Sequence, residues 1–121
     1  MQGPRKVVDD AFISLVERIA RENPDVVYNP NGSSATCSYD TTMRPDGFER
    51  RCLIGEALAQ LGADEVWLSL QNGESAFPVL RQLEYSKHVQ TWALFVQRAQ
   101  DGGMNWAQAV SIANIYRNSH T

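Results

Sequence analysis

The side chains best suited to metal binding are two cysteines and two histidines, which are Cys37, Cys52, His88 and His120. Two thiolates and two imidazoles form a familiar zinc-binding set, but structural zinc sites usually hold their cysteines about two to four residues apart. Fourteen residues separate Cys37 from Cys52. We therefore expect no metal and no cofactor, and we interpret both cysteines as small apolar packing groups with free thiols rather than as a redox pair.

Groups that could perform acid–base catalysis are also few. His88 lies at the start of an expected helix and His120 is next to the last residue. The acidic pairs 9–10 and 64–65 each fall at an expected helix start, where the helix dipole favours negative charge without any catalytic role. The sequence contains no phosphate loop, no Gly-x-Ser-x-Gly and no dinucleotide fingerprint. We therefore expect no catalytic residues and no enzymatic activity.

A second chemistry is DNA recognition, because residues 87–117 are typical of a helix-turn-helix. A Gly102-Gly103-Met104 turn separates two expected helices, and amide side chains on the second helix could contact adenine edges. The candidate DNA contacts on that helix are Gln108, Ser111, Asn114 and Arg117. Few Lys or Arg residues are present to anchor phosphates, so DNA binding is the alternative hypothesis rather than the first one.

The third chemistry is protein–protein contact. The expected helix 87–100 is apolar around much of its circumference, with Leu94 and Phe95 outside its main apolar stripe, so this helix is either central or meets a partner. Tryptophan is enriched at interface hot spots. Of the three tryptophans, Trp92 and Trp106 fall on inward stripes, which leaves Trp67 as the expected exposed anchor. The protein-interaction candidates are therefore Trp67, Leu94 and Phe95.

The elements that must position these residues are mostly helical. Apolar residues at helical spacing predict helices near 7–22, 49–61, 76–85, 87–100 and 105–117, with a short helical turn from Asp64 to Leu70. β-branched and aromatic residues predict a short β-hairpin near 26–39. Inside helix 49–61, Gly55 predicts close approach of another backbone at a helix crossing. The expected fold class is α+β, predominantly α, with about five helices around one core.

Composition sets the limits for these hypotheses. The 121 residues include 11 basic and 14 acidic side chains, for a net charge of −3, which disfavours unspecific nucleic-acid binding. The length fits one globular domain spanning residues 1–121. No apolar run approaches the roughly 20 residues of a membrane-spanning helix, and no secretory signal follows the N-terminus. We therefore expect a cytoplasmic protein with no membrane partner.

Two segments resemble small uncharacterised proteins of actinobacteria and actinobacteriophages. The segments are Cys52–Gly62, with the pattern CLIGxALxxLG, and residues 96–109, with the pattern VQxxQDxGxxWxxA. That group has no established activity, so the resemblance assigns no role to any residue. It implies a phage-encoded accessory protein in a bacterial or host-cell cytoplasm.

From these observations we expect a non-enzymatic accessory protein that acts by protein–protein interaction. Its partner would be a bacterial host protein or a second copy of the chain. The alternative is a DNA-binding regulator that uses the helix-turn-helix at residues 87–117.

Overall fold

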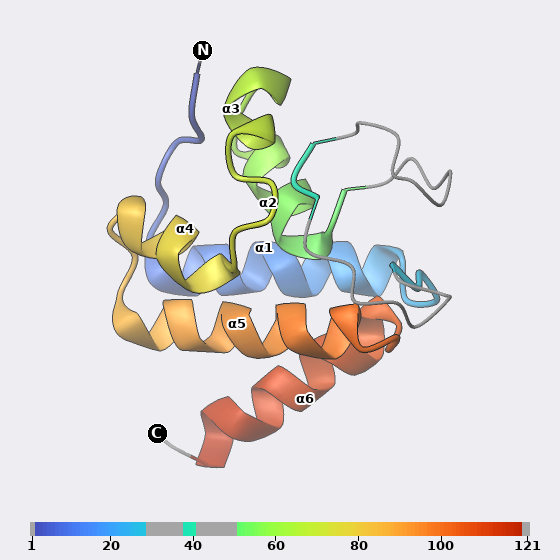
Figure 1. Cartoon of the computed structure of the whole chain (residues 1–121). Helices are drawn as coiled ribbons and strands as arrows, with labels where there is room; N and C mark the ends of the chain where they lie inside the picture. The colour runs from blue at the N-terminus through green and yellow to red at the C-terminus, as the bar shows by residue number, and fades with distance from the viewer. Residues whose placement is uncertain (1, 29–37, 41–50, 120–121) are drawn as a thin grey trace.

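In a computed structural model, which describes residues 2–28, 38–40 and 51–119, the described chain is helical (Figure 1). Its six helices are α1 (Asp9–Glu22), α2 (Leu53–Gln60), α3 (Glu65–Ser69), α4 (Ala76–Gln82), α5 (Lys87–Asp101) and α6 (Trp106–Ser119). The predicted helical character is confirmed. The expected turn after Asp64 is a short helix of its own, which makes six helices rather than five.

Local sequence explains where several of these helices begin and end. The Asp64 carboxylate accepts a hydrogen bond from the Trp67 amide at 2.8 Å and so caps α3. At α6, Asn105 and Gln108 form a capping box, because each side chain accepts a hydrogen bond from the other residue's amide. Gly62 has a φ of +99° and follows α2 in the left-handed conformation that glycine favours at the end of a helix.

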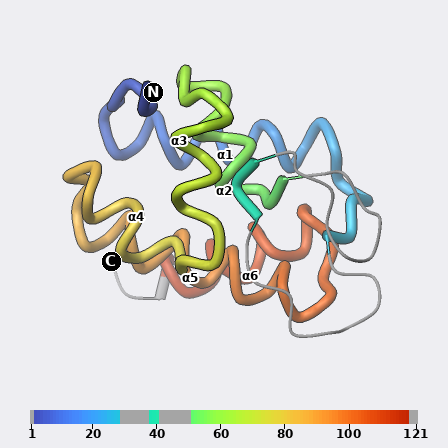
Figure 2. The backbone as a smooth tube through the Cα atoms, turned by 45° about the horizontal axis from the view of Figure 1, so that its top comes forward, coloured from blue at the N-terminus to red at the C-terminus, as the bar shows by residue number. Residues whose placement is uncertain are grey.

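The helices pack around α5. This helix contacts α2, α4 and α6, whereas α1 contacts α2 and α6. In Figure 1, α6 begins beside the end of α5 and diverges from it toward the C-terminus. Figure 1 also shows α3 and α4 on the side of α5 away from α6, and in Figure 2 the N-terminal segment runs beside α3. The central position of α5 explains why its sequence is apolar around so much of its circumference.

The described residues do not support the expected β-hairpin near residues 26–39, so their fold class is α rather than α+β. The described residues contain no strand, and Val27 makes only an isolated antiparallel bridge with Asn105. The backbone carbonyls of Pro24 and Val26 accept hydrogen bonds from Ala107 and Trp106 at the start of α6. These carbonyls therefore satisfy free helix-start amides instead of a neighbouring strand. The connection 29–37 lies outside the described residues.

Gly55 meets another backbone, as its place inside a helix predicted, although the neighbour is not a helix. A Cβ at this position would lie 2.8 Å from the Cα atom and 2.9 Å from the carbonyl oxygen of Tyr39. Tyr39 belongs to the short segment 38–40, whose Ser38 carbonyl accepts a hydrogen bond from the Cys52 amide. The close approach is confirmed, and the expected helix crossing is corrected to a crossing of α2 by this non-helical segment.

Among the described residues, no helix is both long enough and apolar enough to span a membrane.

Candidate interaction surface

Three glutamines on the inward side of α5 were not identified from the sequence as important, and all three are buried: Gln90, Gln97 and Gln100. The Gln97 Oε1 atom accepts a hydrogen bond from the Ala76 amide at 2.7 Å, which caps α4. The Gln100 Oε1 atom accepts from the Leu53 amide at 2.8 Å and from the Trp106 indole at 3.1 Å. These amide groups satisfy helix starts inside the core, so their role is structural rather than catalytic.

Tyr39 is the buried titratable group nearest to these glutamines. Its hydroxyl donates to the Glu74 carbonyl at 2.8 Å and accepts from Gln97 Nε2 at 3.2 Å. Burial raises the pKa of this phenol well above its ordinary value. A phenol that stays protonated and is hydrogen-bonded on both sides holds the segment 38–40 against the core and is poorly suited to proton transfer.

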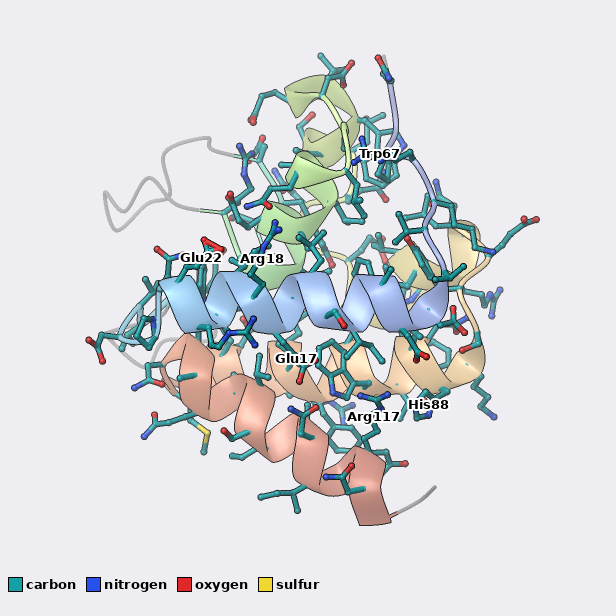
Figure 3. The ribbon with its side chains drawn as sticks, turned by 180° about the vertical axis from the view of Figure 1, so that it is seen from behind. Glu17, Arg18, Glu22, Trp67, His88 and Arg117 are labelled. Atoms are coloured by element: carbon teal, nitrogen blue, oxygen red, sulfur yellow. The ribbon has the colours of Figure 1, made fainter. Side chains whose placement is uncertain are left out.

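Two of the four DNA-contact candidates are bound to other helices. Asn114 accepts a hydrogen bond from the Trp92 indole at 3.0 Å and donates one to the Glu17 carboxylate at 3.0 Å. Arg117 forms an ion pair with Asp10 at 3.7 Å. In Figure 3, Glu17 and Arg117 both lie where α1 faces α6. These contacts engage both side chains within the protein and place carboxylates beside them, where the negative charge would repel DNA.

The other two DNA-contact candidates, Gln108 and Ser111, are exposed. The Gln108 side chain is already used in the cap of α6. The outward side of the expected recognition helix therefore offers one unengaged polar candidate beside apolar residues, and the DNA-binding alternative loses support.

Trp67 does not form the expected exposed anchor. Only 8% of its surface is exposed, and its indole lies against Gly3, where an added Cβ would be 3.0 Å from Nε1. The N-terminal segment is held over α3 because Asp64 accepts a hydrogen bond from the Gln2 amide at 2.7 Å and donates its own amide to the Gln2 carbonyl. Figure 3 shows Trp67 beside this segment. The expectation for Trp67 is therefore wrong.

The other two protein-interaction candidates are half-buried on α5. The ring of Phe95 packs on that of Tyr116, with ring centroids 4.1 Å apart, and so contributes to the α5–α6 contact. Neither side chain is exposed enough to act as the main anchor of an interface.

An uncharged surface with two exposed isoleucines is instead found on α6, and we call it the α6 outer face. It consists of the exposed residues Gln108, Ser111, Ile112, Ile115 and Asn118. Ile115 is 66% exposed and Ile112 is 37% exposed. The only charged side chain of α6 is Arg117, which is paired with Asp10 of α1. Of these five residues, only Gln108 and Ser111 were candidates from the sequence, and they were candidates for DNA contact; Ile112 and Ile115 were not identified.

Cys52 is disulfide-bonded, which corrects the interpretation of this residue as a free thiol. Its Sγ atom also accepts a hydrogen bond from the Gly55 amide at 3.4 Å at the start of α2. Cys37 and His120 lie outside the described residues. Disulfides are typical of oxidising compartments, so the cysteines no longer support a cytoplasmic location. Within the described ranges, no three His, Cys, Asp or Glu side chains are grouped to hold a metal ion.

Comparisons of the chain with protein-family models, with curated proteins and with solved structures found no match.

Proposed function

We propose that this protein is a non-enzymatic interaction module whose docking surface is the α6 outer face. The observation that carries the proposal is the exposure of Ile112 and Ile115 on one side of a well-packed helix. Apolar residues at positions i and i+3 of an exposed helix are the usual anchors of helix-mediated recognition. Arg117 and Asn114, on the other side of α6, fix the helix to α1 and α5, so the outer face is presented rigidly.

The proposed occupant of this surface is the same helix of a second copy. Two copies of a chain with a net charge of −3 repel each other, and the α6 outer face has no charged member to add to this repulsion. A two-fold axis would bring the face against itself, with each Ile115 near the axis. Ser111 is small and allows the two helices to approach closely. A bacterial host protein, the partner that the resemblance implies, is the competing occupant.

The test is sedimentation of the full chain over a concentration series up to about 1 mM, a range that reveals even weak dimers. We expect a reversible monomer–dimer equilibrium that Ile115→Asp weakens by about tenfold or more, because the substitution buries a carboxylate at the centre of the contact. Val66→Asp is the matched control, since Val66 is 59% exposed but lies on α3. This control should leave the equilibrium unchanged.

A wild-type chain that stays monomeric throughout the series would overturn the second copy as the occupant. An equal loss of dimer in both variants would overturn the α6 outer face as the surface. A host protein that binds the wild type and Val66→Asp but not Ile115→Asp would make that protein the occupant.

A further inference from the structure

A cavity of about 270 Å³ opens where α6 diverges from α5, away from the α6 outer face. Its lining residues are Lys87, His88, Thr91, Trp92, Tyr116 and Arg117. In Figure 3, His88 and Arg117 lie close together at this end of the molecule. The volume is slightly below the range of about 300–1,000 Å³ that is usual for ligand pockets, so it fits a small ligand or one group of a larger one.

The polar groups that line this cavity are able to donate hydrogen bonds, and none is a carboxylate. In the part of the chain that the structure describes, the side chains of Lys87, His88 and Thr91 have no interaction partner. Arg117 makes one long ion pair and retains guanidinium N–H groups for a further contact. These hydrogen-bond donors come from two helices and point into one cavity that has no carboxylate in its lining. Such an arrangement favours an anion with several oxygen atoms.

The charges of the lining residues indicate how many negative charges the anion carries. Lys87 and Arg117 supply two fixed positive charges in a chain whose net charge is −3. The acidic groups of the adjoining α1 are engaged elsewhere, since Asp9 contacts the Ser86 amide and Glu17 contacts Asn114. Asp10 is the exception, because it faces Arg117. A doubly charged anion therefore matches the cavity, and Asp10 competes with it for Arg117.

We propose that this cavity between α5 and α6 binds the phosphate group of a small phosphorylated ligand. Lys87 and Arg117 neutralise the charge, and the Thr91 hydroxyl and the His88 ring donate to the remaining oxygens. The Trp92 indole N–H is already bonded to Asn114, so its ring contributes only an apolar wall. The site is independent of the α6 outer face and does not require the protein to dimerise.

The experiment is an NMR titration of the ¹⁵N-labelled full chain with three probes: inorganic phosphate, adenosine 5′-monophosphate and adenosine. We expect saturable shifts for the two phosphate-bearing probes in the amides of residues 87–92 and 114–118, and none for adenosine. Tighter binding of the nucleotide than of phosphate identifies an ester as the ligand, whereas equal binding identifies the free ion. Either result supports a phosphate site.

Variants test the assignment of each charge. Lys87→Gln and Arg117→Gln should each weaken binding about tenfold, the usual effect of losing one charge-assisted hydrogen bond. Asp10→Asn should tighten binding, because it removes the competing carboxylate. Arg98→Gln is the matched control, since Arg98 is an exposed cation of α5 outside the cavity.

Three results would overturn the proposal. The first is the absence of saturable shifts up to about 10 mM probe, beyond which an affinity is too weak for a specific site. The second is binding of adenosine as tight as that of its monophosphate. The third is equal weakening by Arg98→Gln and Lys87→Gln, which would indicate unspecific charge attraction. Because Lys87 is exposed, its substitution leaves the fold intact and keeps the test decisive.

Discussion

Gly55 provides a test at the scale of one residue because two physical effects of its replacement have opposite signs. In a helix interior, Gly→Ala usually stabilises by about 1 kcal/mol. Here the new methyl group would lie 2.8 Å from the Tyr39 Cα atom, closer than packed atoms approach. We predict that Gly55→Ala lowers the free energy of unfolding by about 1–3 kcal/mol, the usual cost of overpacking. Urea unfolding followed by circular dichroism measures the change.

The control for Gly55 is a substitution in the same helix that adds no contact. Gln60 is exposed at the end of α2, so Gln60→Ala should change the free energy of unfolding by less than about 0.5 kcal/mol. A stabilised Gly55→Ala variant would show that the segment 38–40 does not cross α2 as closely as described.

The buried glutamine Gln97 gives a second prediction at this scale. Gln97→Leu has nearly the same volume but leaves the Ala76 amide without its acceptor and the Tyr39 hydroxyl without a donor. A buried polar group without a partner costs about 1–3 kcal/mol. We predict a loss of about 2 kcal/mol in urea unfolding, against almost no change for Gln82→Leu at an exposed site of α4. Equal stabilities of the two variants would contradict the capping role of Gln97.

Gly55 and Gln97 show what local sequence patterns can and cannot predict. Gly55 was identifiable because a glycine inside an apolar helix has a cost that a close neighbour must offset. Gln97 and Gln100 were not identifiable, because the sequence alone does not show whether a glutamine is exposed to solvent or buried against a distant backbone amide. Their acceptors serve Ala76 and Leu53, which are 21 and 47 residues away in the sequence. Contacts of that separation are set by packing of whole helices rather than by spacing along one.

At the scale of the element, the start of α3 predicts a dependence of stability on pH. The hydrogen bond from the Trp67 amide, together with one from Gln2, lowers the pKa of Asp64 below its ordinary value. A depressed pKa contributes stability that is fully present above the unfolded-state pKa of about 3.9 and is lost as pH falls through the folded-state value. We predict that wild type exceeds Asp64→Asn in melting temperature at pH 7 and that the difference shrinks below about pH 3.9.

Asparagine is a suitable comparison because it is also a good helix cap and lacks the charge. It has a single side-chain oxygen and so keeps only one of the two acceptors that Asp64 offers to the Trp67 and Gln2 amides, a loss that does not depend on pH. Thermal unfolding of both chains from pH 7 downward measures the difference. A difference that stays constant over this range would show that the Asp64 charge does not stabilise α3. Asp25→Asn, at an exposed loop residue, controls for a general effect of net charge.

The element scale also shows where sequence patterns succeed and where they fail. The capping box of α6 was predictable, because Asn105 and Gln108 satisfy each other within four residues. The absence of a hairpin was not predictable from this segment. Val26 and Val27 are β-branched residues typical of strands, but the backbone of this segment forms hydrogen bonds with the start of α6. A high content of β-branched residues indicates a half-buried extended segment, but it does not show which other part of the backbone that segment is hydrogen-bonded to.

At the scale of the whole molecule, the interaction surface predicted from the sequence differs from the one exposed in the structure, because segments far apart in the sequence cover each other. Trp67 was the expected exposed anchor, but the N-terminal segment, whose Gln2 is 62 residues from Asp64 in the sequence, lies over α3 and covers the indole. Ile112 and Ile115 are the converse case, because 37% and 66% of their surfaces stay exposed in the folded chain. Exposure depends on the complete fold, so the interaction surface required the structure, whereas the helices did not.

The N-terminal segment 2–6 gives the last prediction, because it joins three parts of the molecule. The Arg5 amide donates to the Leu61 carbonyl, and the Lys6 ammonium donates to the Glu84 carbonyl, while Gly3 covers Trp67. Deletion of residues 2–6 should expose the Trp67 indole and lower the free energy of unfolding by about 2 kcal/mol, the value expected for uncovering roughly 100 Å² of apolar surface. The measurable sign is a shift of tryptophan emission to longer wavelength.

The source of that emission can be isolated because the other two tryptophans are almost fully buried, with 1% of Trp92 and none of Trp106 exposed. Trp67→Phe in the full chain and in the shortened chain should therefore give the same emission maximum, whereas the two chains that retain Trp67 should differ. A shift that persists in the Trp67→Phe pair would mean that the deletion loosens the core around α5. No shift in either pair would mean that residues 2–6 do not cover α3, and Trp67 would regain its place among the exposed anchors.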